Sequence, residues 1–366
     1  MTQTLRIVHT ESSCGWGGQE IRILTEAAGM MERGHQLHIL CVEGSNIHHE
    51  AMKRGIPVTG LPIGRKNFSG LHAIRRWLRD NPVDVVNTHS STDSWLVALA
   101  RLGLQKRIPV VRTRHISALI PQNWATRWLY TKGCDFVVTT GERLREYVIE
   151  RTQIAVGKTL SVPTGIDAQR FMSGDRDTAR RTLGLPTDRS MIGIVATIRT
   201  WKGHVYLVEA LAKLKQTNVE LLIVGDGPNQ ANVQRVVDEC QLNDRVRFVG
   251  QQENVVPWLQ AMDIFVLPSY ANEGVPQSLI QAMMCGVPVI STNVGSITEL
   301  VADQSTGIIV PAKNADDLAA AIQVLLANSQ RREQLAKMGQ STVLSNFSLD
   351  IMIRKMETVF VATRCS

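Results

Sequence analysis

The residues whose types and spacing point most directly to chemistry lie between Glu273 and Gln281. The apolar run Ile264 to Leu267 is typical of a strand, a Gly-Val-Pro turn occupies residues 274–276, and Gln277 to Cys285 has the pattern of a helix. The first N–H groups of a helix lack partners within it, and together with the helix dipole they form a ready site for an anion. The sequence therefore predicts an anion site where this helix begins.

Two side chains near this helix start suit a sugar diphosphate. The carboxylate of Glu273 can accept hydrogen bonds from sugar hydroxyl groups, and the amide of Gln281, about one turn into the helix, can bond a ribose hydroxyl. The phosphates would lie against the helix start, which is formed by Gly274, Val275, Pro276, Gln277 and Ser278. An ordinary helix preceded by a Glu-Gly-x-Pro turn is the alternative interpretation, and the segment alone does not exclude it.

A basic pair follows another apolar run, Ile192 to Ile198. Arg199 and Lys202 stand there just before Gly203. A planar guanidinium and a mobile ammonium group suit a diphosphate, since breaking a bond between sugar and phosphate leaves negative charge on the departing oxygen. A surface Arg and Lys beside a helix start is the alternative. Two further turns, at residues 225–228 and 295–299, could shape the same pocket or be turns only.

A glycine loop follows the first apolar strand and opens the first helix. Gly17 and Gly18 in this loop would allow the backbone to approach a phosphate closely. The loop also partly fits the G-x-G-x-x-G fingerprint of nicotinamide dinucleotide sites, with Glu43 near the place of the ribose-binding acid. Glu20 stands where the third glycine should be, which disfavours that interpretation.

Two histidines follow strand-like runs of the first half. His115 ends the run 109–115, where its ring could bond a sugar hydroxyl or orient an acceptor, and His89 after the run 83–88 is a second, weaker candidate. A single histidine is more often structural than catalytic. The end of a strand nevertheless favours a functional role for His115.

The elements that must position these residues alternate between strand and helix in both halves of the chain. This alternation predicts an α/β fold with two doubly wound, Rossmann-like domains, each with a parallel sheet covered by helices on both faces. Proline and glycine in residues 162–167 suggest a boundary that gives domains 1–165 and 166–366, and the last helix, about 350–364, is expected to cross back onto the first domain. Ligands of such sheets bind beyond the carboxyl ends of the strands, where the candidate residues lie.

On these residues the chain resembles the family 4 glycosyltransferases, which are two-domain enzymes of the GT-B fold. The spacing from Glu273 to position 281 fits the E-x7-E signature, with Gln281 in place of the second Glu, and Ala-Met-Met-Cys-Gly-Val-Pro-Val-Ile at 282–290 is also characteristic. The resemblance implies that the two domains face one another across a cleft. It also implies a nucleotide-sugar donor, either UDP-sugar or GDP-sugar, and transfer with retention of configuration.

The same resemblance assigns roles to the candidate residues. Glu273 would contact the transferred sugar and position 281 the nucleotide ribose, while Arg199 and Lys202 would grip the diphosphate. The glycine loop would close over the donor from the amino-terminal, acceptor-binding domain, and His115 would face the reacting sugar. The carboxyl-terminal domain would bind the nucleotide sugar.

Metal and disulfide chemistry are not expected. Asp175-Arg-Asp177 has the D-x-D form of a metal-binding motif, but it follows no apolar strand and is interpreted as a cap for a helix over Thr178 to Leu183. The cysteines are scattered without a Cys-x-x-Cys pair, at positions 14, 41, 134, 240, 285 and 365. We therefore expect reduced thiols and neither a metal nor another cofactor.

Charge bears on the acceptor. Residues 1–165 hold 21 Lys and Arg against 13 Asp and Glu, a net charge of +8, whereas the whole chain of 366 residues carries +7. Clusters such as Arg112-Thr-Arg114 suit an anionic membrane surface, an anionic acceptor or nucleic acid. No signal peptide or membrane-spanning run is evident, so a cytoplasmic enzyme with peripheral contact to the inner membrane surface is expected.

The combined expectation is a metal-independent, retaining glycosyltransferase. Its acceptor would be a glycan or glycolipid in the assembly of bacterial lipopolysaccharide, O-antigen or capsule, with no nucleic acid as partner. Three alternatives stay open at this point. A sugar-nucleotide epimerase or a phosphorylase could share the fold, and a NAD-dependent oxidoreductase would use the glycine loop instead.

Overall fold

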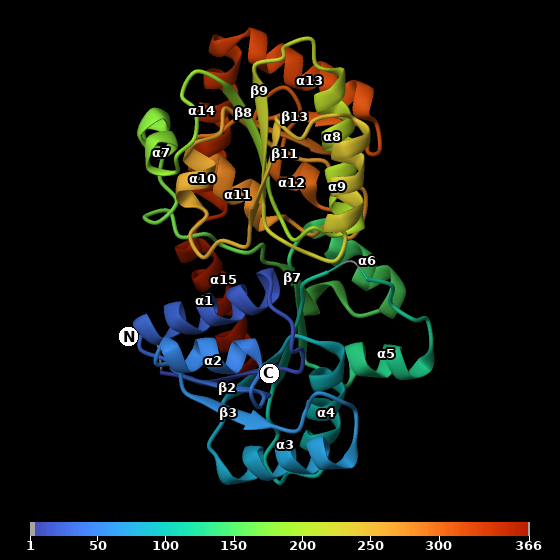
Figure 1. The fold of residues 1–366 in the computed structure, drawn as a ribbon. Coiled ribbons are helices and arrows are strands. Elements are labelled where there is room, and N and C mark those ends of the chain that lie inside the picture. Colours follow the sequence, from blue (N-terminus) through green and yellow to red (C-terminus); the bar gives the residue numbers. More distant parts are fainter. Residues whose placement is uncertain (1–3, 117, 365–366) are drawn as a thin grey trace. The chain divides into compact units, whose positions relative to one another are not determined.

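The computed structural model describes residues 4–116 and 118–364. These residues form two compact units (Figure 1). The first unit combines the chain up to Gly165 with the part from Leu349 onward, and the second unit runs from Ile166 to Ser348. Each unit is described below by itself.

The first unit is built on a parallel sheet of seven strands in the order β3-β2-β1-β4-β5-β6-β7. The strands are β1 (Arg6–Glu11), β2 (Gln36–Val42), β3 (Val58–Leu61), β4 (Val85–Thr88), β5 (Val110–Arg114), β6 (Phe136–Thr139) and β7 (Thr159–Ser161). The order reverses between β1 and β4, the place where a doubly wound sheet opens a crevice for ligands.

Helices cover both faces of this first sheet. Their bounds are α1 (Gly18–Glu32), α2 (Asn46–Lys53), α3 (Phe68–Asp80), α4 (Ser91–Arg101), α5 (Trp124–Thr131), α6 (Glu142–Thr152) and α15 (Leu349–Arg364). One apolar core gathers side chains of α1, α2 and α15, and the other gathers side chains of α3, α4, α5 and α6. The expected doubly wound arrangement is confirmed for this unit.

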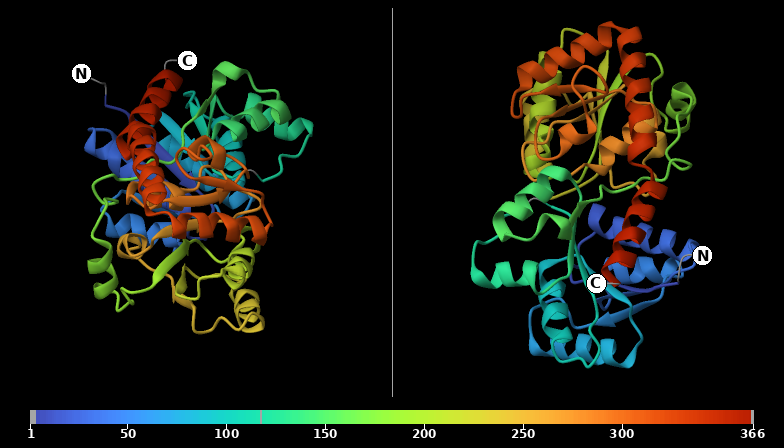
Figure 2. Two further views of the ribbon diagram at one scale, coloured as in Figure 1. Left: turned by 90° about the horizontal axis from the view of Figure 1, so that it is seen from above. Right: turned by 180° about the vertical axis from the view of Figure 1, so that it is seen from behind.

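Helix α15 completes the first of these two cores. It packs on α1, β4 and β5, and Met352, Met356 and Phe360 are buried in the contact. Figure 2 shows α15 in red beside α1 in blue. The two helices approach so closely that a Cβ at Gly29 of α1 would lie 2.8 Å from Cδ1 of Ile353.

The second unit repeats the plan with a parallel sheet of six strands in the order β10-β9-β8-β11-β12-β13. The strands are β8 (Ser190–Val195), β9 (Val219–Val224), β10 (Val246–Gly250), β11 (Ile264–Leu267), β12 (Val289–Thr292) and β13 (Ile308–Val310). The helices are α7 (Arg176–Thr182), α8 (His204–Lys213), α9 (Gln230–Glu239), α10 (Val256–Gln260), α11 (Gln277–Met284), α12 (Ile297–Leu300), α13 (Ala315–Ala327) and α14 (Ser329–Asn346). The order reverses between β8 and β11.

The sequence pattern did not indicate three of the strands. These are β3, β7 and β13, and each of them lies at an edge of its sheet. A strand of three or four residues at an edge has one neighbour and needs no continuous apolar run, so its sequence signal is weak. One predicted strand also begins later than expected, because the run 83–88 forms β4 only from Val85.

Candidate functional site

The predicted donor residues of the second unit follow two neighbouring strands. Arg199 and Lys202 lie in the turn after β8, and Glu273 lies in the loop after β11. Strands β8 and β11 pair in parallel at the point where the strand order reverses. The fold therefore brings together residues that are 71 positions apart in the sequence.

Lys202 and Glu273 contact each other directly. The Lys202 ammonium nitrogen lies 2.6 Å from Oε1 of Glu273, and the hydroxyl of Ser269 donates to the same oxygen at 2.6 Å. Glu273 is buried, with 6% of its surface exposed, whereas the Lys202 side chain is 20% exposed. The pair thus places a fixed carboxylate and a more accessible cation at the switch point of the sheet.

Two glycines allow the loops of this site to touch through their backbones. Gly203 has φ +77°, and a Cβ there would lie 2.1 Å from the carbonyl oxygen of Pro268. Gly295 has φ +57°, and its Cβ would lie 2.0 Å from the carbonyl oxygen of Glu273. Larger residues would push these loops apart, so both glycines hold Glu273 in place.

The other predicted donor residues surround this pair. Arg199 is exposed, and its guanidinium lies 5.2 Å from the centre of the Trp201 ring. Helix α11 begins at Gln277 after Pro276, whose side chain makes no capping hydrogen bond. The half-buried residues at its start and first turn are Gly274, Gln277, Ser278 and Gln281, while Val275 and Pro276 are buried.

His204 is a buried neighbour that the sequence did not single out. It follows Gly203 as the first residue of α8, and neither of its ring nitrogens has a hydrogen-bond partner among the described residues. Burial, reinforced by the charge of Lys202, lowers the pKa of His204 to about 3. The ring therefore stays neutral, and the positive charge of the turn comes from Arg199 and Lys202.

In the first unit, the predicted glycine loop opens α1. Gly17 is the residue before the helix and has an extended backbone, and Gly18 is the first helical residue. A Cβ at Gly17 would find its nearest neighbour at 3.7 Å, an ordinary contact with Glu20. The fold itself therefore does not require glycine at position 17.

His115 belongs to a chain of three histidine rings. Its Nε2 lies 2.9 Å from Nδ1 of His89, and Nε2 of His89 lies 2.8 Å from Nδ1 of His9. Burial holds the pKa of each ring far below its ordinary value, to about 3 for His9. Because each ring is neutral and has one N–H, His89 in the middle donates to one of its two neighbours and accepts from the other.

Two buried carboxyl groups lie beside this histidine chain. The hydroxyl of Thr10 donates to Asp93 at 2.6 Å and the backbone N–H of His89 donates to it at 2.9 Å, while Glu11 accepts from the N–H of Ser13 at 2.6 Å. Burial, with the charge of Asp93 as a second cause, raises the pKa of Glu11 to about 8. Burial also raises the pKa of Asp93 to about 6.

His9, Glu11 and Asp93 were not predicted from the sequence. A Ser-x-x-Asp capping box at the start of α4 explains the position of Asp93 and was visible as a pattern. Polar residues at the end of an otherwise apolar β1 were the corresponding signal for His9 and Glu11.

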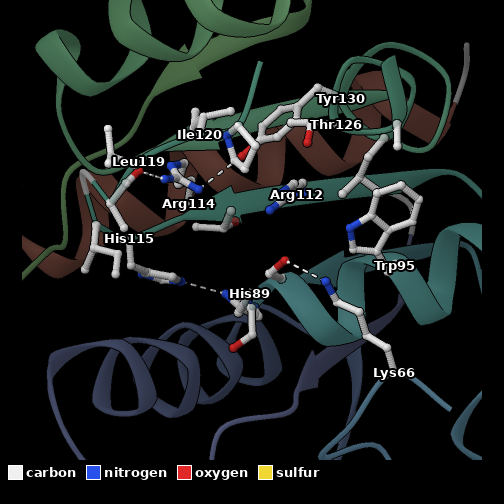
Figure 3. A pocket seen from close by; sticks show the side chains of 18 of the residues that line it. Lys66, His89, Trp95, Arg112, Arg114, His115, Leu119, Ile120, Thr126 and Tyr130 are labelled. Atoms are coloured by element: carbon white, nitrogen blue, oxygen red, sulfur yellow. Dashed lines mark hydrogen bonds between the residues drawn. The ribbon is translucent and has the colours of Figure 1, made fainter. Parts of the chain in front are cut away.

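A cavity of about 540 Å³ lies in the first unit, formed by loops and helices around the carboxyl end of β5 (Figure 3). His89 and His115 line one side, and Lys66 and Trp95 line another (Figure 3). Arg112 and Arg114 from β5 also line it. Its volume is in the range of small-molecule sites.

The D-x-D motif is a helix cap, as the sequence predicted. Helix α7 begins at Arg176, and Asp175 accepts a hydrogen bond from the N–H of Thr178 at 2.8 Å. Within the described residues, no group of three His, Cys, Asp or Glu side chains could hold a metal ion. The five described cysteines are free thiols, and Cys365 lies outside the described residues.

Membrane crossing was not expected from the sequence. Among the residues that the structure describes, no helix has the length and apolar character needed to cross a membrane.

Comparison with known proteins agrees with the two-unit architecture. The model of Glycosyltransferase Family 4 matches residues 16–170, and the model of Glycosyl transferases group 1 matches residues 175–342. The chain is 31% identical over 318 residues to the lipopolysaccharide core biosynthesis mannosyltransferase LpsB of Rhizobium meliloti, covering 82% of this chain and 86% of that protein. It is 27% identical over 362 residues to the D-inositol 3-phosphate glycosyltransferase of Stackebrandtia nassauensis, covering 87% and 81%.

Solved structures show the same fold. HepE of Anabaena in complex with UDP-glucose superposes with a TM-score of 0.86 at 18% identity, covering 98% of this chain and 100% of that one. The two parallel α/β sheets are thus those of the GT-B fold. The chain belongs to the family 4, group 1 glycosyltransferases, which use nucleotide-sugar donors without a metal cofactor.

Proposed function

We propose that the chain moves a sugar, with retention of configuration, from a nucleotide diphosphate donor bound by the second unit to a glycan acceptor bound by the first. The observation that carries the proposal is the contact between Lys202 and Glu273 at the switch point of the second sheet. A cation and a hydrogen-bond acceptor side by side match the two ends of a sugar diphosphate, its phosphates and its sugar hydroxyls.

The diphosphate of the donor would form an ion pair with Lys202. In the structure this ammonium group neutralises Glu273, and a bound phosphate would offer it a second anionic partner. Arg199 and the amino-terminal end of α11 would supply further positive potential. These groups would stabilise the charge that develops on the leaving oxygen, the step in which electrostatic stabilisation contributes most.

The transferred sugar would lie against Glu273. Because Ser269 and the backbone contact at Gly295 fix this carboxylate, it would receive sugar hydroxyl groups in a constant position. Gln281 would bond the ribose through its amide. UDP is the nucleotide that we favour over GDP, because HepE, which shares the fold, was solved with UDP-glucose.

The acceptor would bind in the first unit near His115. The hydroxyl of the acceptor would attack the anomeric carbon from the face that the diphosphate leaves. The glycine loop at Gly17 and Gly18 would let the donor approach α1, since the fold itself has room for a side chain at Gly17. The similarity to LpsB and the basic composition of residues 1–165 favour a lipid-carried bacterial glycan, reached from the cytoplasmic membrane surface.

A thermal-shift panel of nucleotide sugars on the full chain tests the proposal. A ligand that binds only the folded state raises the melting temperature, by an amount that grows with concentration above the Kd. We expect a rise with UDP-sugars that Lys202→Met reduces and that Lys213→Met, a change in an exposed ion pair of the same unit, leaves intact. No response to any UDP- or GDP-sugar would overturn the proposal, and a converted sugar nucleotide in the absence of acceptor would indicate an epimerase instead.

A further inference from the structure

The cavity of the first unit has a one-sided charge. The described residues that line it include three cations, Lys66, Arg112 and Arg114. No Asp or Glu is among the described lining residues. Three cations around about 540 Å³ without a carboxylate in the wall create a positive potential inside the cavity. An anionic ligand would satisfy that potential.

Arg112 is the strongest indication of an anionic ligand in this cavity. It is buried, with 5% of its surface exposed, and its Nη1 has no hydrogen-bond partner among the described residues. Its guanidinium carbon lies 4.3 Å from the centre of the Tyr130 ring, so the planar group is held by stacking. A buried charge is costly unless it is paired, and a protein retains one where a ligand completes the pair.

No carboxylate of the fold supplies that partner. Among the described residues, no Asp or Glu oxygen lies within 4.0 Å of a guanidinium nitrogen of Arg112, so Arg112 forms no ion pair there. Burial raises the pKa of Asp93 and the charge of Arg112 opposes part of that rise, but this carboxyl group already accepts from Thr10, Ser12 and two backbone N–H groups. Asp93 is therefore occupied, and Arg112, which lines the cavity, keeps an Nη1 without a hydrogen-bond partner among the described residues.

The other walls fit a sugar that carries the anion. Arg114 is fixed by a hydrogen bond of 3.1 Å to the Tyr130 hydroxyl and by another to the carbonyl of Ala118. Lys66 lies 5.8 Å from the centre of the Trp95 ring, and Trp95 stacks on Trp128 behind it. Figure 3 shows Trp95 and Arg114 on either side of Arg112. An aromatic face beside a cationic group suits a sugar ring with an oxyanion on it.

We propose that this cavity binds the acceptor through an oxyanion, a phosphate ester or a carboxylate carried by the acceptor sugar, with Arg112 as its main contact. The proposal rests on the proposed function only in naming the ligand as the acceptor. It narrows the acceptors of this enzyme to acidic sugars. Neutral sugars would leave Arg112 unpaired.

Titration calorimetry of the full chain at constant ionic strength tests this assignment with glucose 6-phosphate, glucuronate and glucose as probes. We expect at least one acidic sugar to bind ten-fold or more tightly than glucose, and the stronger of the two identifies the anion as phosphate or carboxylate. Arg112→Met should abolish the difference, while Arg112→Lys should keep part of it, since it retains the charge and loses the planar fork. Arg127→Met, an exposed arginine on α5 outside the cavity lining, is the matched control and should change nothing.

The ligand-free melting temperature separates a binding role from a structural one. If the role of Arg112 is to bind a ligand, the melting temperature of Arg112→Met should be no lower than that of the unaltered chain, because the substitution removes an unpaired buried charge. Arg114→Met provides a second variant should Arg112→Met fail to fold. Equal affinities for all three sugars, or an unchanged preference in both variants, would overturn the proposal.

UDP-glucose titrated into the same samples distinguishes the two levels of inference. Binding of UDP-glucose with no preference for acidic sugars refutes the cavity assignment alone. A preference for acidic sugars without UDP-sugar or GDP-sugar binding refutes the proposed function and leaves the oxyanion site standing.

Discussion

Two ion pairs of the second unit have the same distance between their charged atoms, but one is buried and the other is exposed. Comparing them gives a matched test of the proposed donor site. Lys202 to Glu273 and Lys213 to Asp316 both measure 2.6 Å. The side chains of the first pair are 20% and 6% exposed, and those of the second are 46% and 79% exposed. Changing each lysine to methionine removes the same charge from two different environments.

Burial sets the expected size of each effect. Lys202→Met leaves a buried carboxylate with Ser269 as its remaining side-chain donor, a loss of about 1–3 kcal/mol in the free energy of unfolding. Lys213→Met breaks a solvated pair that contributes about 0.2–1 kcal/mol. For a unit of this size each kcal/mol lowers the melting temperature by about 2–4 °C.

Activity should separate the two variants further. If Lys202 holds the leaving diphosphate, Lys202→Met should lower kcat by roughly 10²–10³, the usual loss when one preorganised donor is removed. Lys213→Met should leave kcat unchanged. Melting by differential scanning fluorimetry and product formation from a radiolabelled sugar nucleotide measure the two effects.

A double-mutant cycle makes the reasoning refutable. Glu273→Gln removes the charge that Lys202→Met strands, so the double variant should recover stability relative to Lys202→Met and show a coupling of about 1–3 kcal/mol. It should not recover kcat. If Lys202→Met and Lys213→Met behave alike in both assays and the cycle shows no coupling, the pair does not have the role assigned to it.

Three further predictions concern the loops, the buried acids and metal. Gly295→Ala should lower both kcat and the melting temperature, because its Cβ would lie 2.0 Å from the carbonyl oxygen of Glu273. The control Gly34→Ala, with φ +88° and open space around it, should lower the melting temperature alone. An unchanged kcat in Gly295→Ala would contradict this. Glu11 has a pKa of about 8 in the fold and an ordinary value of 4.5, so its favourable contribution is complete below pH 4.5 and is lost as the pH rises through 8. Glu11→Gln should therefore gain stability relative to the unaltered chain between pH 5 and pH 9 in urea unfolding, and a difference independent of pH would show that Glu11 does not titrate this way. Asp175→Ala should lower the melting temperature through the loss of a helix cap without losing transfer activity, and EDTA should leave the rate unchanged. A rate that falls in either experiment would point to a metal site.

The sequence was sufficient for the architecture and for the places along the chain of the residues that we propose bind the donor. Long apolar runs between turns located the central strands, and the positions just after them located Arg199, Lys202 and Glu273. It could not show that Lys202 contacts Glu273, because that contact depends on β8 and β11 being neighbours in the sheet. Spacing along the chain does not determine strand order.

The polar interior of the first unit was harder to foresee. Arg112 and Arg114 belong to one strand and look alike in the sequence, yet Arg114 has hydrogen-bond partners for both of its Nη atoms and Arg112 has an open Nη1 among the described residues. That difference comes from Tyr130 on α5 and from the carbonyl of Ala118, which follows β5. The connected rings of His9, His89 and His115 likewise come from three strand ends and have no local signature.

The discontinuous first unit has a consequence for how the protein is made. Its seven strands leave the ribosome before α15 exists, so the apolar surface that Met352 and Phe360 later cover stays exposed while residues 166–348 are synthesised. The second unit can fold during this interval, since its two ends already meet, with Ile166 donating to the Phe347 carbonyl at 3.0 Å. Nascent chains should thus pass through a stage in which the later unit is native and the earlier one is not, the reverse of the usual amino-to-carboxyl order. Chimeras that exchange the first unit between relatives must therefore carry α15 together with residues 1–165.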